Sequence, residues 1–509
     1  MLSKVNSVGL MGIDGFAVSV EADVTGGLPG FEIVGLGDAA VKEARERVRS
    51  GIKNSGYIFP SKKIIVNMAP ASMRKEGAGY DLPIAVSIMA ATGQIPNPKE
   101  DAVFIGELSL DGSVNRISGV LPMVISMFER GYRDFYVPES AAREAAVVEN
   151  ANIYPVKKLS ELLSHLKDDE KIEPYKCCGI DITNQAENTL LDFCDVKGQE
   201  SAKRALEIAA AGNHNVLLIG PPGTGKTMLA QRMPSILPDL SFEESLEVSK
   251  IHSIAGTLNQ DEPLITGRPF RNPHHTISTV GLAGGGTVPK PGELSLAHNG
   301  VLFLDELPEF KREALEVMRQ PLEDGKVTIS RVNATLTYPC NLMLIASMNP
   351  CKCGFLGDSK RECTCTPSQI NQYRSKISGP LLDRIDIQVE VASVEYDDLN
   401  SAEKGETSAK IKERVNKARE IQRKRYKDYK IYSNSQLTAG MMEEFCHIDS
   451  AASDILKLAF ERMGLSARAH SRILKVARTI ADLSGERDIK PEHIAEAIQY
   501  RNLDRKFFG

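Results

Sequence analysis

One octapeptide near the middle of the chain limits the possible folds more than any other part of the sequence. It fits the pattern G-x-x-x-x-G-K-[ST], with the apolar stretch 215–219 before it and a helical pattern after it. Its glycines allow backbone N–H groups to wrap a chain of phosphates. We therefore expect a nucleotide to bind at Gly220, Pro221, Pro222, Gly223, Thr224, Gly225, Lys226 and Thr227.

Two residues of this loop and an acidic pair downstream predict a hydrolytic site. Lys226 is expected to neutralise the β- and γ-phosphates, and the Thr227 hydroxyl to bind Mg²⁺. The apolar stretch 301–304 ends in Asp305 and Glu306. Asp305 suits Mg²⁺ binding, and Glu306 suits activation of a water. The alternative is a solvated pair of loop acids.

Two more polar residues lie beside expected strands of the same sheet. Asn349 follows the stretch 342–346 and could orient the attacking water, although Asn-Pro is also an ordinary turn. Arg384 lies just before the stretch 385–389. A cation there could reach the γ-phosphate held by a neighbouring subunit, or form a surface ion pair with an adjacent aspartate.

Strand and helix patterns divide the chain. Residues 1–170 are predicted to form an α/β unit, 171–190 a linker, 191–395 an α/β domain with a parallel sheet, and 396–509 a helical domain. The 509 residues are 42% hydrophobic and 25% charged, which suits a protein of about three globular cores. Because no stretch is apolar enough to cross a membrane and the N-terminus makes a poor signal peptide, we expect a soluble cytoplasmic protein.

Four of the nine cysteines lie close together in two C-x-C pairs. Such clustering in a cytosolic chain favours a metal over disulfides, and four thiolates can close a tetrahedral Zn²⁺ site. The spacing is tighter than the usual C-x₂₋₄-C, so free thiols and a redox or iron–sulfur role stay open as alternatives. The residues are Cys351, Cys353, Cys363 and Cys365.

Two basic regions are candidates for contact with a polyanion. Residues 323–339 look like a β-hairpin with Lys326 and Arg331 near one end, where they could touch a phosphate backbone. Residues 410–430 hold ten Lys and Arg against three acids, with tyrosines interleaved and following. For both regions the simpler explanation is a solvated surface.

Together these motifs resemble AAA+ ATPases of the magnesium-chelatase-like branch, and most closely the bacterial YifB/ComM family. The resemblance covers nearly the whole chain and includes Phe-Leu-Asp-Glu, Ser-Met-Asn-Pro and Gly-Pro-Leu-Leu-Asp-Arg-Ile-Asp. It implies that Asn349 is sensor 1, that Arg384 is an arginine finger acting in trans, and that Arg468 is sensor 2 acting in cis. It further implies ATP and Mg²⁺ as cofactors, a homo-oligomeric ring with six subunits as the expected number, and the 323–339 hairpin in its pore.

Residues 1–170 resemble the proteolytic domain of Lon proteases in fold. Segment 74–83 lies where Lon carries its serine, yet no serine occurs between Ser72 and Ser87. The lysine expected after segment 105–114 is also missing. Because a Ser–Lys dyad needs both partners, we expect no proteolysis here, and assembly or DNA contact instead.

The resemblance implies an ATP-hydrolysing motor that acts on DNA, by branch migration or helicase activity in recombination or natural transformation. The basic regions favour this interpretation. The alternatives are a chelatase-type motor that inserts Mg²⁺ into a porphyrin, an ATPase that remodels a protein client, and an ATP-dependent protease. The Lon-like unit is foreign to the chelatase subunit, and the missing dyad weakens the protease hypothesis.

Overall fold

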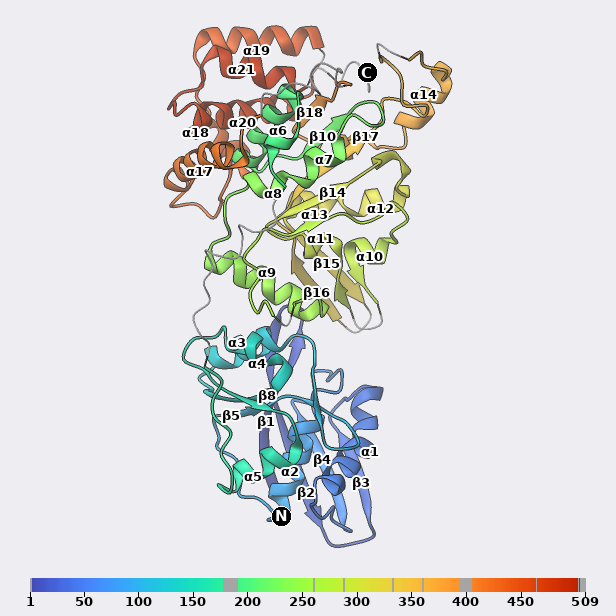
Figure 1. Ribbon diagram of the computed structural model, residues 1–509, viewed down its shortest axis with the longest axis vertical. Coiled ribbons are helices and arrows are strands. Elements are labelled where there is room, and N and C mark those ends of the chain that lie inside the picture. The colour runs from blue at the N-terminus through green and yellow to red at the C-terminus, as the bar shows by residue number, and fades with distance from the viewer. Residues whose placement is uncertain are drawn as a thin grey trace.

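The computed structural model describes residues 2–176, 191–259, 261–286, 289–331, 334–358, 361–393, 405–463, 465–501 and 503. Three parts follow one another along its long axis (Figure 1), and we call them the N-terminal unit, the central unit and the helical unit. Within the described residues, no helix is both long and apolar enough to cross a membrane. The predicted α/β fold is confirmed. The predicted domain limits stay predictions, and most of the expected linker lies outside the described residues.

The N-terminal unit (residues 2–166) is built on a seven-stranded sheet in the order β3-β4-β2-β1-β5-β8-β9. Alternate residues of β2 are buried, from Phe16 to Val24, because a strand turns every second side chain to the same face. The strands are β1 (Leu2–Met11), β2 (Asp14–Thr25), β3 (Gly30–Val34), β4 (Lys63–Ala69), β5 (Ala102–Phe104), β8 (Asp134–Pro138) and β9 (Asn152–Val156), with a small pair β6 (Glu107–Leu108) and β7 (Val114–Asn115). The helices are α1 (Ala39–Asn54), α2 (Asp81–Ala91), α3 (Val120–Glu129), α4 (Glu139–Ala145) and α5 (Leu159–Leu166).

The central unit (residues 200–390) contains a five-stranded sheet in the order β11-β14-β17-β10-β18, and every neighbouring pair is parallel. Its inner strands are buried throughout and mostly apolar, since helices cover both faces of such a sheet. The strands are β10 (Val216–Ile219), β11 (Phe270–Arg271), β14 (Val301–Leu304), β17 (Met343–Met348) and β18 (Ile387–Glu390). The longer helices are α6 (Glu200–Gly212), α7 (Lys226–Gln231), α9 (Phe242–Ala255), α12 (Arg312–Val317), α13 (Arg319–Asp324) and α14 (Pro367–Arg374), and short ones are α8 (Met233–Ile236), α10 (Thr279–Ala283), α11 (Glu293–Leu296) and α15 (Gly379–Leu382).

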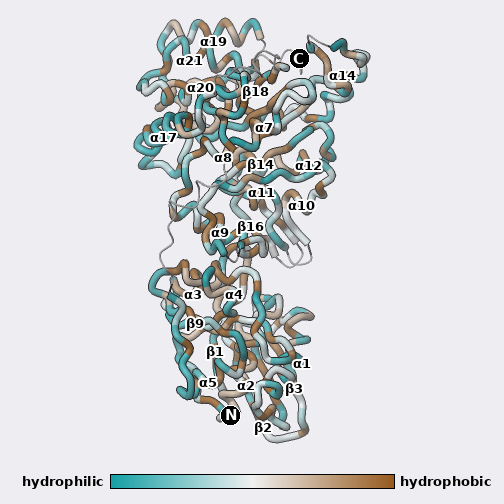
Figure 2. The backbone as a smooth tube through the Cα atoms, viewed as in Figure 1, coloured by the Kyte–Doolittle hydropathy of each residue, from teal (hydrophilic) through white to brown (hydrophobic). Residues whose placement is uncertain are grey.

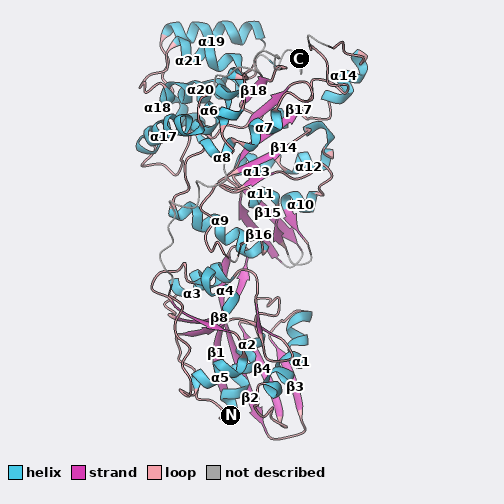
Figure 3. Ribbon diagram, in the orientation of Figure 1, coloured by secondary structure: helices cyan, strands magenta, loops and turns pink. Residues whose placement is uncertain are grey.

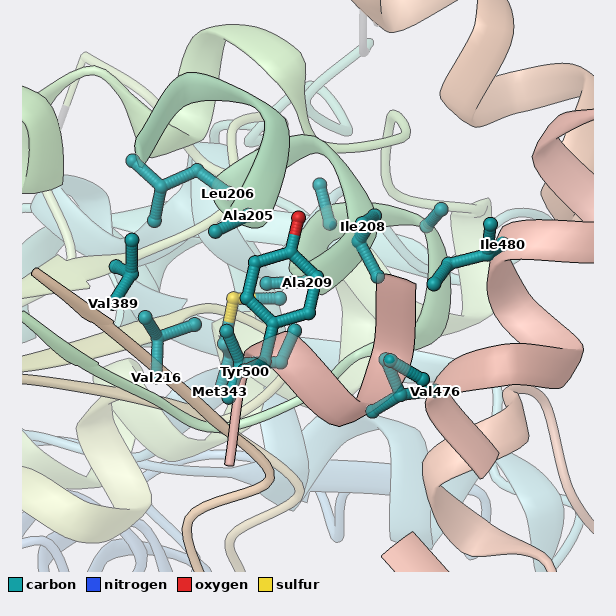
Figure 4. Close-up of a cluster of buried hydrophobic side chains, with 14 of the residues drawn as sticks. Ala205, Leu206, Ile208, Ala209, Val216, Met343, Val389, Val476, Ile480 and Tyr500 are labelled. Atoms are coloured by element: carbon teal, nitrogen blue, oxygen red, sulfur yellow. The ribbon is translucent and has the colours of Figure 1, made fainter. Parts of the chain in front are cut away.

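The helical unit holds no strand among its described residues, as Figure 3 shows. Its helices are α17 (Ser408–Arg425), α18 (Ala439–Phe445), α19 (Ser450–Met463), α20 (Ala467–Leu483) and α21 (Pro491–Gln499). An apolar stripe on α20, including Val476 and Ile480, packs against α6 beside the sheet (Figure 4). The central and helical units therefore share one hydrophobic core.

The N-terminal and central units meet where α3 packs on α9. Helix α9 begins at a capping box formed by Ser241 and Glu244. Near its other end, the Ser253 carbonyl accepts a hydrogen bond from Gly119 N–H at 3.0 Å, and the Ser253 hydroxyl donates to Glu144. This contact fixes the N-terminal unit next to the edge of the central unit that also carries the hairpin β15 (Lys326–Arg331) and β16 (Ala334–Pro339).

Candidate nucleotide-binding site

The phosphate loop leaves the carboxyl end of β10 and leads into α7. Gly225 has φ +86°, a left-handed conformation that glycine adopts without strain, and this turns the chain into the helix. Lys226 Nζ donates to Gly220 O at 2.7 Å, to Pro221 O at 2.8 Å and to Asn349 Oδ1 at 3.2 Å. Burial lowers the pKa of Lys226 to about 8. The ammonium group is thus held inside the loop by oxygens that an arriving phosphate can replace.

The acidic pair follows β14 at the same edge of the sheet. Thr227 Oγ1 donates to Asp305 Oδ2 at 2.7 Å, and the Ser347 hydroxyl donates to Asp305 Oδ1. A hydroxyl and a carboxylate side by side, next to a phosphate loop, are the protein ligands that Mg²⁺ commonly has in such sites. The residues present therefore fit a magnesium ion. Ser347 was not predicted as a site residue, although its place two residues before Asn349 on β17 was a usable signal.

Glu306 projects from an unusual backbone conformation. Its φ of +54° is left-handed, which is uncommon for a residue other than glycine and is often found at functional sites. Its side chain is 57% exposed and has His275 Nδ1 3.9 Å from Oε2. The exposed carboxylate lines the cavity next to the phosphate loop. The sequence predicted Glu306 as a site residue but gave His275 no role.

These side chains line one cavity of about 390 Å³, a size common for small-molecule sites. The cavity lies at the carboxyl edge of the parallel sheet, where α/β proteins of this kind bind their ligands. The structure thereby brings together the predicted phosphate loop, acidic pair and Asn349. The lining residues are Pro222, Gly223, Thr224, Gly225, Lys226, Thr227, Met228, Asp305, Glu306, Ser347, Met348 and Asn349.

Arg384 and Arg468 lie in a different place, a groove of about 1130 Å³. The groove is lined by Asn215, Asn299 and Asn341, which precede or begin the strands β10, β14 and β17. It is therefore at the amino edge of the sheet, opposite the nucleotide cavity. The two edges are separated by the length of a strand, about 20 Å for the six residues of β17.

The two arginines are held by acids at this edge. Arg384 Nη1 donates to Pro380 O at 2.7 Å, and its Nη2 pairs with Glu323. Arg468 is 62% exposed and its Nη1 is 3.1 Å from Asp383 Oδ2. The packing of α20 places Arg468 beside Arg384, and its role toward the nucleotide of its own chain stays a prediction. The action of Arg384 on a neighbouring chain likewise stays a prediction.

The predicted hairpin is present, with a corrected placement of its two cations. Lys326 is exposed and pairs with Pro339 at the base of the hairpin, whereas Arg331 pairs with Ala334 at the far end. They are at opposite ends of β15 and not near one end, because six extended residues span about 20 Å. Val327 is buried against the core, and this holds the base of the hairpin on the central unit.

Arginines of helix α17 form ion pairs with acids elsewhere in the same chain, although Figure 2 shows the helix as strongly hydrophilic. Arg414 pairs with Glu207, and Arg425 pairs with Asp482. Tyr426 is fully buried and donates to Asn434 Oδ1 at 2.6 Å. The arrangement favours the simpler of the two explanations for residues 410–430, a charged helix that packs on the central unit.

The Lon-like segment of the N-terminal unit carries buried charge with a structural role. Asp81 is fully buried, accepts from Arg47 Nε at 2.6 Å and accepts from Leu108 N–H at 3.1 Å. These bonds fasten α2 to α1 and to the small β6 strand. Segment 74–83 contains no serine, so it offers no serine nucleophile for proteolysis.

The four predicted metal-binding cysteines lie together. Cys351 Sγ is 3.3 Å from Cys353 Sγ and 3.6 Å from Cys363 Sγ, and Cys353 N–H donates to Cys365 Sγ at 3.4 Å. All four sulfur atoms lie within 4.8 Å of one another. Four thiolates at 2.3 Å from a zinc ion are separated by about 3.8 Å in a tetrahedron. The cluster therefore has the dimensions of a four-thiolate zinc site.

Lys226→Ala is expected to raise the Kd for ATP about 10- to 150-fold, since a charge-assisted contact with phosphate is worth about 1.5–3 kcal/mol. Isothermal titration or a fluorescent ATP analogue measures this directly. Lys311→Ala, which changes an exposed lysine beyond the acidic pair, is the control and should bind normally. Tight ATP binding by Lys226→Ala would show that the nucleotide binds elsewhere.

Known family models and known proteins match nearly the whole length of the chain. Family models described as magnesium chelatase subunit ChlI match residues 192–399 and 20–141, and the model of the C-terminal part of that subunit matches 405–501. The competence protein ComM of Haemophilus influenzae is 43% identical over 514 residues, which cover 99% of this chain and 98% of ComM. The chain belongs to the magnesium-chelatase-like YifB/ComM family.

Other relatives agree with this membership. The YifB protein of Escherichia coli is 42% identical over 507 residues, covering 99% of this chain and 98% of YifB. Lon protease 2 of Bacillus subtilis is 33% identical over 146 residues, 26% of each chain. Membership of the YifB/ComM family, which is an AAA+ family, implies ATPase activity with ATP and Mg²⁺, in proteins that are usually oligomeric. The predicted family is confirmed.

Proposed function

We propose that this YifB/ComM-family chain is an ATP-driven ring motor that acts on DNA, by branch migration or helicase activity in recombination or natural transformation. One observation carries the motor part of the proposal. The nucleotide cavity and the Arg384 groove lie at opposite edges of one sheet, so a complete hydrolytic site needs two chains. Head-to-tail contacts of this kind close into a ring, and a hexamer is the proposed size.

The hydrolytic step uses side chains of the cavity. Lys226 exchanges its carbonyl partners for phosphate oxygens, and the Thr227 hydroxyl and Asp305 hold the magnesium ion. Held by Thr227 and Asp305, a magnesium ion would supply positive charge that offsets the negative charge developing on the phosphate oxygens. Glu306 accepts a proton from the attacking water, and Asn349 orients that water.

Arg384 of the neighbouring chain completes the site by stabilising charge on the γ-phosphate. To reach that phosphate it must leave Glu323, which lies in the last turn of α13, just before the hairpin begins at Lys326. The exchange therefore changes a contact at the base of the hairpin. This supports a motor in which hydrolysis at the interface moves the β15–β16 hairpin, with Lys326 and Arg331 as proposed contacts to the DNA backbone.

Two observations support DNA as the polymer being moved. The closely related Haemophilus influenzae protein is named a competence protein. The hairpin also presents an exposed lysine beside exposed hydroxyl side chains at Thr328 and Ser330, and such groups contact phosphates in many DNA complexes.

The experiment is steady-state ATPase with and without single-stranded DNA, duplex DNA and a branched junction. We expect DNA to stimulate turnover, and the stimulation to fall steeply as salt increases. Porphyrin and casein report on the chelatase and protein-client alternatives. A flat response to every DNA, with intact basal turnover, would contradict the DNA proposal and favour a protein client.

Lys326→Ala is expected to weaken DNA stimulation and to reduce the salt slope by about 1, because one phosphate contact is lost. The matched control is Lys417→Ala, an exposed lysine of α17 that pairs with Glu413. Equal DNA stimulation in both variants would remove Lys326 from the DNA contact.

We also propose that the cysteine cluster holds a structural Zn²⁺ ion. Its support is the fit of four sulfur atoms to a closed tetrahedral site. Metal analysis of reduced, purified protein should then find about one zinc per chain.

A further inference from the structure

The loop that carries the four cysteines lies directly against the phosphate loop. Gly354, between the second and third cysteines, has φ +90°, and a Cβ atom there would lie 2.7 Å from Pro222 Cδ. No side chain fits into that space, so the two loops are in van der Waals contact through backbone and proline ring. Pro222 also lines the nucleotide cavity. The cysteine loop therefore packs directly against a residue of the phosphate loop that lines the cavity.

A second connection joins the cysteine loop to Asn349. Cys351 follows Asn349 by two residues and is fully buried. Beyond the last cysteine the chain enters α14, which returns to the same place: Arg374 Nε and Nη2 donate to Pro350 O, each at 3.3 Å. Both arms of the loop thus end at Pro350, the residue that follows Asn349, and Asn349 in turn contacts Lys226.

Within the described residues, the loop has little buried core. Cys351 and Gly354 are its buried members among the described residues, and the others are half-buried or exposed. Its other contacts include a guanidinium over a ring, Arg361 above Phe355 at 5.1 Å, and a weak 3.4 Å hydrogen bond from Ser393 to Asp358. A segment with so small an apolar core needs a cross-link to hold one shape, and a bound metal supplies one.

We propose that a zinc ion bound by Cys351, Cys353, Cys363 and Cys365 braces the phosphate loop and Asn349, so that nucleotide affinity depends on metal occupancy. The inference rests on the proposed ATP site and makes nucleotide binding at that site dependent on a bound metal. With metal bound, Gly354 is held against Pro222 and the cavity is organised before ATP arrives. Without metal the cysteine loop moves away from Pro222. Nucleotide binding must then order the loop again, and this lowers the affinity for nucleotide.

The test compares three variants of the full chain for zinc content and for affinity toward a fluorescent ATP analogue. The double variant Cys363→Ser/Cys365→Ser changes the arm farther from Asn349 and should lose zinc and bind nucleotide about tenfold more weakly, equal to about 1.4 kcal/mol. Gly354→Ala should keep zinc and still bind more weakly, since its Cβ pushes Pro222. Cys194→Ser, a half-buried cysteine outside the cluster, is the control and should match the wild type.

A metal-restoration experiment on the wild type makes the inference independent of misfolding in the variants. Chelator-treated protein is titrated with Co²⁺ while thiolate-to-cobalt absorption and nucleotide affinity are both followed, and circular dichroism checks that the fold is retained. Affinity should recover in step with the absorption band. Affinity that stays constant as the band fills, or wild-type affinity in both the zinc-free and Gly354→Ala variants, would overturn the inference.

These results also separate this inference from the proposed ATP site. If the brace is wrong but the site is right, every metal state binds nucleotide equally and Lys226→Ala still loses it. If the site itself is wrong, the zinc-loaded wild type fails to bind nucleotide, or Lys226→Ala binds it normally.

Discussion

Glu306→Gln is expected to lower the kcat for ATP hydrolysis by about 10²- to 10⁴-fold, the usual contribution of a general base, while ATP still binds. The amide keeps the size of the side chain but cannot accept the proton of the attacking water. Lys226, Thr227 and Asp305 are unchanged, so the contacts to the phosphates and the magnesium ion remain. Single-turnover hydrolysis and nucleotide binding, measured on the same preparation, separate the two effects.

The matched control is Glu309→Gln, three residues further along. Glu309 pairs with Lys376 at the surface and does not line the cavity. Its variant makes the same change of charge and should hydrolyse ATP normally. Turnover by Glu306→Gln within tenfold of the wild type would mean that another group, with His275 as the nearest side chain of suitable chemistry, activates the water.

Arg384→Ala is expected to lower kcat by about 10³- to 10⁵-fold, the range found when an arginine finger is lost. The size of this effect is informative because Arg384 lies a strand length, about 20 Å, from the cavity of its own chain. If Arg384 formed only a surface ion pair, it would contribute about 0–1 kcal/mol to stability and nothing to ATP hydrolysis in its own chain. Steady-state ATPase at saturating ATP, with oligomeric state checked by light scattering, measures the loss.

Arg143→Ala on α4 is the control for removal of a surface arginine, and it should have little effect. If Arg384→Ala forms normal assemblies and keeps near wild-type turnover, Arg384 serves only its ion pair with Glu323. A loss of assembly together with turnover would assign Arg384 to the subunit contact first.

The residues of the nucleotide cavity could be predicted because each belongs to a short motif at the end of a strand. A phosphate loop requires a strand before it, and parallel strands bring Asp305 and Asn349 to the same edge. Two other parts depended on information that is not local. Ser347 contacts Asp305 from a neighbouring strand, and Arg468 is placed by how α20 packs on α6.

Two features of the fold could have been predicted more fully. The alternation of apolar residues from Phe16 to Val24 is a clear strand pattern, yet the first two strands were not anticipated. The separation of Lys326 from Arg331 also follows from the rise of an extended strand. In contrast, the contact of Gly354 with Pro222 joins residues more than 100 positions apart, and no pattern in the sequence announces it.

The measurement that tests the shared site most directly is a mixing experiment with Lys226→Ala and Arg384→Ala chains. Each variant alone should be nearly inactive, since one lacks the phosphate-binding lysine and the other the arginine supplied to its neighbour. In a mixed ring, an Arg384→Ala chain keeps an intact cavity and a Lys226→Ala neighbour supplies an intact arginine. We expect the mixture to hydrolyse ATP at a rate well above that of either variant alone. Mixed assemblies that form but stay as inactive as their components would contradict a site built from two chains.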